Sequence, residues 1–120
     1  MSTMIDFPVL VRQTKLAACG QACVAMLTGF TLDEAVQLIG HGGITSDQEL
    51  LTALGIDGEF IEGSAPSNII ALQKHKEPNG EREHWTVSRY GTILDPACFG
   101  SRCWPASKYI PVMCWSVRNG

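Results

Sequence analysis

The chain has 120 residues, 45% of them hydrophobic, and a net charge of −3, which suits one domain with its own apolar core. Lysine and arginine form no cluster, so the charge argues against a nucleic-acid partner or an anionic membrane surface. The first residues carry neither a basic start nor a long apolar run, so we expect no secretory signal, no membrane span and a cytoplasmic protein. The five cysteines of a cytoplasmic protein argue against a disulfide framework, because the cytosol keeps thiols reduced and an odd count leaves one cysteine unpaired.

The first predicted helix contains the cysteine on which the functional interpretation depends. Residues 22–27 are apolar almost all round, which indicates a helix buried on every side rather than an amphipathic one. Cys19 opens this run and Gly29 follows its end, where glycine commonly caps a helix. We expect Cys23, one turn after Cys19, to be a core thiol, with a redox partnership between the two as the alternative.

Two capping boxes predict two further helices. In a capping box a Ser or Thr side chain accepts from the backbone three residues on, where a Glu side chain reaches back. Thr31 with Glu34 predicts a helix over about 32–39. Ser46 with Glu49 predicts the next helix, which a glycine closes.

The second half of the chain is β-like. We expect the segment 74–83 to be an exposed charged loop in which His75 is solvated. The part around Ile69 fits either a strand or a helical turn. Helices followed by strands predict an α+β fold, with functional groups meeting where the two parts join. The β-like segments cover residues 59–62, 68–72, 84–95 and 109–117.

The sequence from His84 to Asp95 predicts a hairpin with a definite register. If Tyr90–Gly91 is the turn, Thr86 lies opposite Asp95, and His84 shares the face of Thr86 because side chains alternate along a strand. Asp95 is then a diagonal neighbour of His84, close enough for the side chains to meet. A three-residue turn would direct Asp95 to the other face. The same register predicts a core-facing group of Trp85, Val87 and Leu94.

These residue types fit nucleophilic catalysis by a thiol. A thiol attacks carbonyl carbon as the thiolate, which the positive end of a helix and a nearby imidazolium both favour at Cys19. His84 is the candidate base, and Asp95 would orient it. Gln13 could supply an amide N–H that stabilises an oxyanion beside the backbone N–H of Cys19. Gly20, which has no Cβ, would let a substrate backbone approach closely.

The chain resembles the papain-like peptidases that process bacteriocin leaders, the double-glycine peptidase type, and their free-standing bacterial and phage relatives. The matching residues, in order, are Gln13, Cys19-Gly20, Ala22-Cys23, Ala25-Met26, His84-Trp85 and Asp95-Pro96. The resemblance implies a papain-like cysteine peptidase fold, with N-terminal helices packed on a C-terminal antiparallel sheet, in a single catalytic domain over 1–120. It also implies a nucleophile at Cys19, a base at His84, an orienting carboxylate at Asp95 and an oxyanion donor at Gln13.

The expected activity is that of a cysteine peptidase or isopeptidase. The partner would be a peptide or protein substrate, cleaved after a small residue such as glycine, with no cofactor and no metal; the oligomeric state is left open. The alternatives are an acyl transferase, deamidase or transglutaminase using the same thioester, or a non-catalytic papain-like binding domain. A zinc-binding module using some of the histidines and cysteines is a further alternative, with the possible thiol ligands Cys19, Cys23, Cys98, Cys103 and Cys114.

Overall fold

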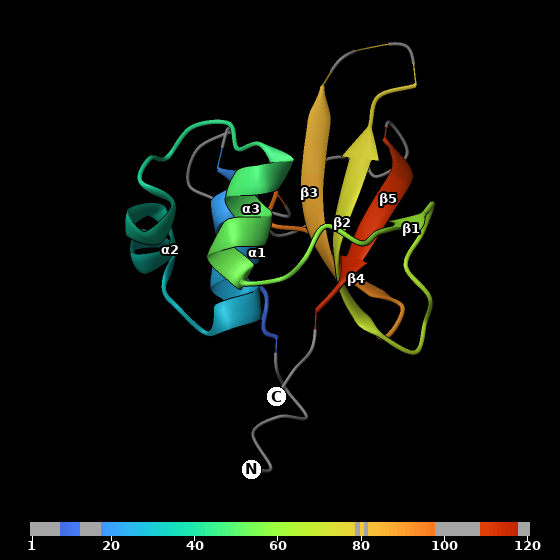
Figure 1. Cartoon of the computed structure of the whole chain (residues 1–120), viewed down its shortest axis with the longest axis horizontal. Helices are drawn as coiled ribbons and strands as arrows, with labels where there is room; N and C mark the ends of the chain where they lie inside the picture. The colour runs from blue at the N-terminus through green and yellow to red at the C-terminus, as the bar shows by residue number, and fades with distance from the viewer. Residues whose placement is uncertain (1–7, 13–17, 79, 81, 98–108, 118–120) are drawn as a thin grey trace.

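Helices and sheet form two layers in the computed structural model, which describes residues 8–12, 18–78, 80, 82–97 and 109–117. Within these residues three helices precede a five-stranded antiparallel sheet, so the predicted α+β class is confirmed. Figure 1 shows the helices on one side of the sheet, with strand order β1-β5-β2-β3-β4. The helices are α1 (Cys19–Thr28), α2 (Leu32–Ile39) and α3 (Asp47–Leu54); the strands are β1 (Ile61–Glu62), β2 (Ile70–Lys76), β3 (Glu83–Arg89), β4 (Thr92–Leu94) and β5 (Ile110–Ser116).

The boundaries of α2 and α3 follow from local hydrogen bonding. Both predicted capping boxes are present, because Thr31 and Ser46 each accept from a backbone N–H while Glu34 and Glu49 each reach back. These contacts satisfy N–H groups that a helix cannot pair internally. A glycine in the left-handed conformation follows the last residue of all three described helices. Within the described residues no helix alone is long and apolar enough to cross a bilayer; only α1 and α2 jointly meet that test, across a 109° bend.

Helix α1 is the centre of the molecule. All its residues from Cys19 to Leu27 are buried, as its apolar sequence predicted. It packs against α2, α3 and β3. A Cβ at Gly20 would collide with the hydroxyl of Thr45 and would lie 3.1 Å from a methyl group of Leu50. The packing of α1 on neighbouring segments therefore requires a glycine at this position.

The hairpin of β3 and β4 has the predicted register. Val87 pairs with Leu94, and the turn consists of Tyr90 and Gly91. Both turn residues have positive φ, 48° for Tyr90 and 88° for Gly91, which is the backbone that matches the twist of a two-residue hairpin. The short turn therefore fixes which side chains of the two strands share a face.

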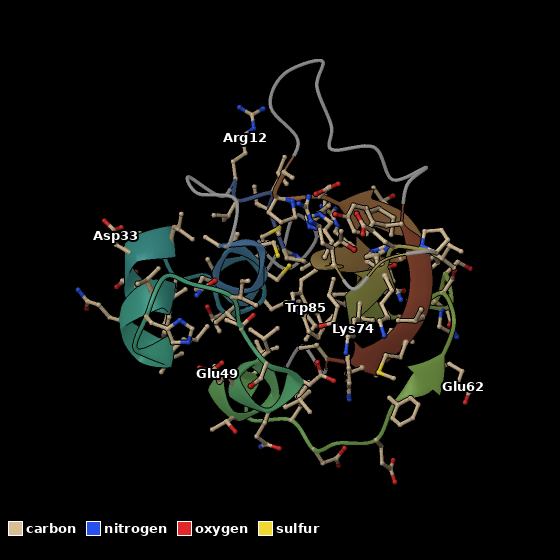
Figure 2. The ribbon with its side chains drawn as sticks, turned by 90° about the horizontal axis from the view of Figure 1, so that it is seen from above. Arg12, Asp33, Glu49, Glu62, Lys74 and Trp85 are labelled. Carbon is tan, nitrogen blue, oxygen red and sulfur yellow. The ribbon has the colours of Figure 1, made fainter. Side chains whose placement is uncertain are left out.

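The core lies between α1 and the sheet. Trp85 and Val87 face it from β3, as predicted, and Leu72 and Trp115 join them from the neighbouring strands. Figure 2 shows Trp85 in the interior between helices and sheet. The opposite face of β3 is also buried, at the side chains His84, Thr86 and Ser88. A functional side chain on that face is therefore held by packing from two directions.

The prediction of an exposed loop over 74–83 is wrong at both ends of that segment. Residues 74–76 belong to β2 and Glu83 belongs to β3, so only the middle of the segment connects strands. The ammonium of Lys74 lies 3.0 Å from Asp47 of α3 and 3.1 Å from Glu83. It also lies 5.7 Å from the centroid of the Trp85 ring. Paired carboxylates and an aromatic face allow a charged side chain to be mostly buried here.

Candidate active site

Cys19 is the first residue of α1, where the helix presents unpaired N–H groups. The preceding residue, Ala18, is the N-cap, and no side chain of the described residues caps this end. The partial positive charge of the helix therefore acts on the Cys19 side chain. Cys19 itself is buried, with 8% of its surface exposed, so little water competes with that field.

His84 and Asp95 form the hydrogen bond that the hairpin register predicted. Nε2–H of His84 donates to Oδ1 of Asp95 over 2.7 Å, and both side chains are nearly nine-tenths buried. The backbone N–H of Ala97 donates to the same oxygen over 2.9 Å. Two donors thus hold the carboxylate in place, and Nδ1 of His84 is left for another partner.

Cys19 is the other group that acts on His84. Burial alone would lower the pKa of His84, but hydrogen bonds to Asp95 and to Cys19, with the negative charges of both groups, raise it to about 9. His84 is therefore an imidazolium at neutral pH. The three side chains come from the start of α1, from β3 and from the segment after β4. The fold thus brings together the three predicted residues Cys19, His84 and Asp95.

Cys23 lies beside this group but differs from Cys19 in its environment. It is fully buried, as predicted for a core thiol. Burial raises its pKa, and the negative charges of Cys19 and Asp95 raise it further. Both effects favour the neutral thiol form of Cys23.

Two further rings contact His84. The ring of Tyr109 has its centroid 5.6 Å from that of His84, and the ring of His75 has its centroid 6.2 Å away. Both residues are buried, so the prediction that His75 is solvated is wrong. The sequence analysis also missed Tyr109, because nothing in its neighbours marks a contact with a distant strand.

Another side chain that the sequence did not single out supports helix α1. Gln21 is fully buried in the first turn of α1. Its Nε2–H₂ donates to the carbonyl oxygens of His41 and Gly43, over 2.9 and 2.8 Å. His41 itself is partly exposed, with its Nε2 2.6 Å from a Glu49 carboxylate oxygen. Gln21 thus ties the turn after α2 to the helix that carries Cys19.

Gln13, the predicted oxyanion donor, lies outside the described residues, as do Cys98 and Cys103 of the zinc alternative. Among the residues that are described, no group of three His, Cys, Asp or Glu side chains is arranged to hold a metal ion. Comparisons of the sequence with models of protein families and with curated proteins find no match.

Proposed function

We propose that this protein is a thiol-dependent hydrolase, a cysteine peptidase or isopeptidase with Cys19 as nucleophile. One observation carries the proposal. His84 is hydrogen-bonded to Asp95, and its interactions with Asp95 and with Cys19 raise its pKa to about 9. A base oriented by a third group and touching a thiol at a helix N-terminus is the arrangement that nucleophilic catalysis by cysteine needs.

The proposed reaction uses each of these groups in turn. The Cys19 thiolate attacks the carbonyl carbon of the scissile bond, while the backbone N–H of Cys19 stabilises the oxyanion. The His84 imidazolium gives its proton to the leaving amine, and a thioester remains. Neutral His84 then takes a proton from water as that water attacks the thioester; the carboxylic acid leaves, and the Cys19 thiolate and the His84 imidazolium are regenerated. Asp95 keeps the ring in orientation throughout.

A second oxyanion donor is the role proposed for Gln13, on the basis of the resemblance to papain-like peptidases. The same resemblance suggests a peptide or protein substrate with a small residue, such as glycine, before the scissile bond. If an amine replaced water in the second step, the thioester would give acyl transfer or transglutamination. The first experiment should therefore monitor Cys19 rather than one product.

Selective alkylation tests the proposal without a substrate. We would treat the folded protein with limiting iodoacetamide from about pH 5 to about pH 9 and identify the modified cysteine by mass spectrometry. We expect labelling of Cys19 well below the ordinary thiol pKa of about 8.5. Buried Cys23 is the internal control and should stay unmodified. His84→Ala should remove the labelling at low pH.

Slow and unselective labelling, unchanged in His84→Ala, would contradict the proposal and leave Cys19 as a core thiol. The zinc-binding alternative is tested on the same preparation by its metal content. Stoichiometric zinc in the purified protein, lost together with the fold on chelation, would favour that alternative.

A further inference from the structure

We infer that His75 is a positioning residue for the proposed catalytic group: its imidazole, tied to β3 through Thr86, fixes the orientation of His84. This inference rests on the proposed function, because it assigns His75 a role in keeping His84 aligned between Cys19 and Asp95. It concerns a residue that would act through its neighbour and would not contact the substrate.

The strand register places the two histidines together. His75 of β2 pairs directly with His84 of β3, and directly opposed residues of an antiparallel pair project from the same face. Their ring centroids are 6.2 Å apart, with the ring planes inclined by 42°. The ring of His75 therefore forms part of the wall against which His84 packs.

A hydrogen bond fixes this wall to the strand that carries the base. Nε2 of His75 lies 2.7 Å from Oγ1 of Thr86, two residues along β3 from His84 and on the same face. The bond between His75 and Thr86 thus runs diagonally between neighbouring strands, as does the bond between His84 and Asp95. A change in the tilt of His75 would be transmitted to His84 through both the ring contact and β3.

The charges of the group are consistent with this role. Burial lowers the pKa of His75, and the positive charge of His84 lowers it further, to about 4, against a smaller opposing effect of Asp95. On the other neighbouring strand, Pro111 of β5 lies opposite His75 and has no titratable group. Tyr109 contacts the ring of His84. Between about pH 4 and about pH 9 the two histidines therefore hold one charge, on His84.

A purely space-filling role does not explain an imidazole at this position. Nδ1 of His75 is buried and has no hydrogen-bond partner among the described residues. A buried polar atom without a partner destabilises the folded state, and an apolar ring of similar size would avoid that cost. What the imidazole adds over such a ring is its bond to Thr86, and hence a fixed tilt.

Three substitutions separate positioning from packing. His75→Phe keeps a ring but removes the bond to Thr86, and Thr86→Val removes the same bond from the other partner. His75→Gln retains a nitrogen that can reach the Thr86 hydroxyl. Ser88→Ala is the matched control, because Ser88 is another buried polar side chain on that face of β3. For each variant we would measure the alkylation rate of Cys19 against pH, and the pKa of His84 by NMR.

Positioning predicts that His75→Phe and Thr86→Val slow alkylation near pH 6 by roughly 10- to 100-fold. It also predicts that both shift the pKa of His84 down from about 9 towards 6.5. His75→Gln should restore most of the rate, and Ser88→Ala should match the natural protein. If the Phe and Val variants are less stable but keep the rate profile and the pKa of His84, His75 is only structural and the inference fails. If the natural protein itself shows no labelling of Cys19 at low pH, the proposed function fails instead.

Discussion

His84 and Asp95 are eleven residues apart in sequence, and their side chains meet over 2.7 Å. The two-residue turn of β3 and β4 makes this possible, because it places both side chains on one face of the hairpin. The backbone N–H of Ala97 donates to the same carboxylate oxygen and also holds it in place. The orienting half of the proposed triad is thus a property of one local hairpin, whereas Cys19 comes from the opposite layer of the fold.

The first prediction concerns the relative importance of the three proposed catalytic residues. Cys19→Ala should abolish turnover and leave the fold intact. His84→Ala should slow alkylation of Cys19 near pH 6 by roughly 10²-fold or more, because an ordinary thiol is about 1 part in 300 thiolate there. Asp95→Asn should slow alkylation less than His84→Ala does, since the amide oxygen of the new side chain still accepts a hydrogen bond from His84. Rates from mass spectrometry, with circular dichroism for the fold, check this order; full turnover by Cys19→Ala would contradict the assignment.

The second prediction concerns the strain in the hairpin turn. Tyr90 has φ 48°, a left-handed backbone that costs a side chain with a Cβ about 1–2 kcal/mol. It is also largely exposed, so replacing it sacrifices little packing. Tyr90→Asn should raise the free energy of unfolding by about 0.5–1 kcal/mol, because Asn-Gly is a preferred turn of this type. Tyr90→Val, whose branched side chain tolerates this backbone poorly, should lower it in the same urea titration.

The third prediction tests why α1 has a glycine after its cysteine. In an exposed helix, alanine in place of glycine stabilises by about 1 kcal/mol. At Gly20 the added Cβ meets the Thr45 side chain, so Gly20→Ala should instead destabilise by about 1–3 kcal/mol. Combining it with Thr45→Ala should recover part of that loss. Additive effects in this double-mutant cycle would contradict the contact.

The fourth prediction is a maximum of stability near pH 6.5. The pKa of His75 is lowered from 6.5 to about 4. Its contribution to the free energy of unfolding is therefore complete above pH 6.5 and is lost as the pH falls towards 4. The pKa of His84 is raised from 6.5 to about 9. Its contribution to the free energy of unfolding is therefore complete below pH 6.5 and is lost as the pH rises through 9. Melting temperatures across this range should peak between the two limits. His75→Gln should flatten the acid side, and an unchanged acid side would contradict the assignment to His75.

Local sequence rules predicted the parts of the fold that local contacts determine. The starts of α2 and α3 follow from Thr31 and Ser46, whose capping partners are three residues away. The hairpin register follows from a turn of two residues, so the contact of His84 with Asp95 could be deduced before any coordinates were known. These features depend on neighbours in the chain or on one tight turn, both of which the sequence displays directly.

The sequence could not reveal features that depend on distant partners. Lys74 and His75 stand in a charged run typical of a loop, and only pairing with β3 and the carboxylate of Asp47 makes their burial favourable. The Pro-Asn-Gly sequence at 78–80, a turn signal, could have indicated that two strands flank it. The packing reason for a glycine at position 20 could not be predicted, because Thr45, which lies against Gly20, is distant in sequence. The catalytic use of Cys19, His84 and Asp95 stays a prediction.

Because α1 is buried on all sides, the environment of Cys19 should persist for as long as the whole molecule stays folded. A surface helix can lose its first turn while the rest of the protein stays folded, but the first turn here is enclosed by α2, α3 and β3. Amide protons of this helix should therefore exchange with solvent only through openings that approach global unfolding in free energy. Heat or denaturant should then expose Cys19 and unfold the core in one cooperative step, with no intermediate in which Cys19 is exposed while the sheet is intact.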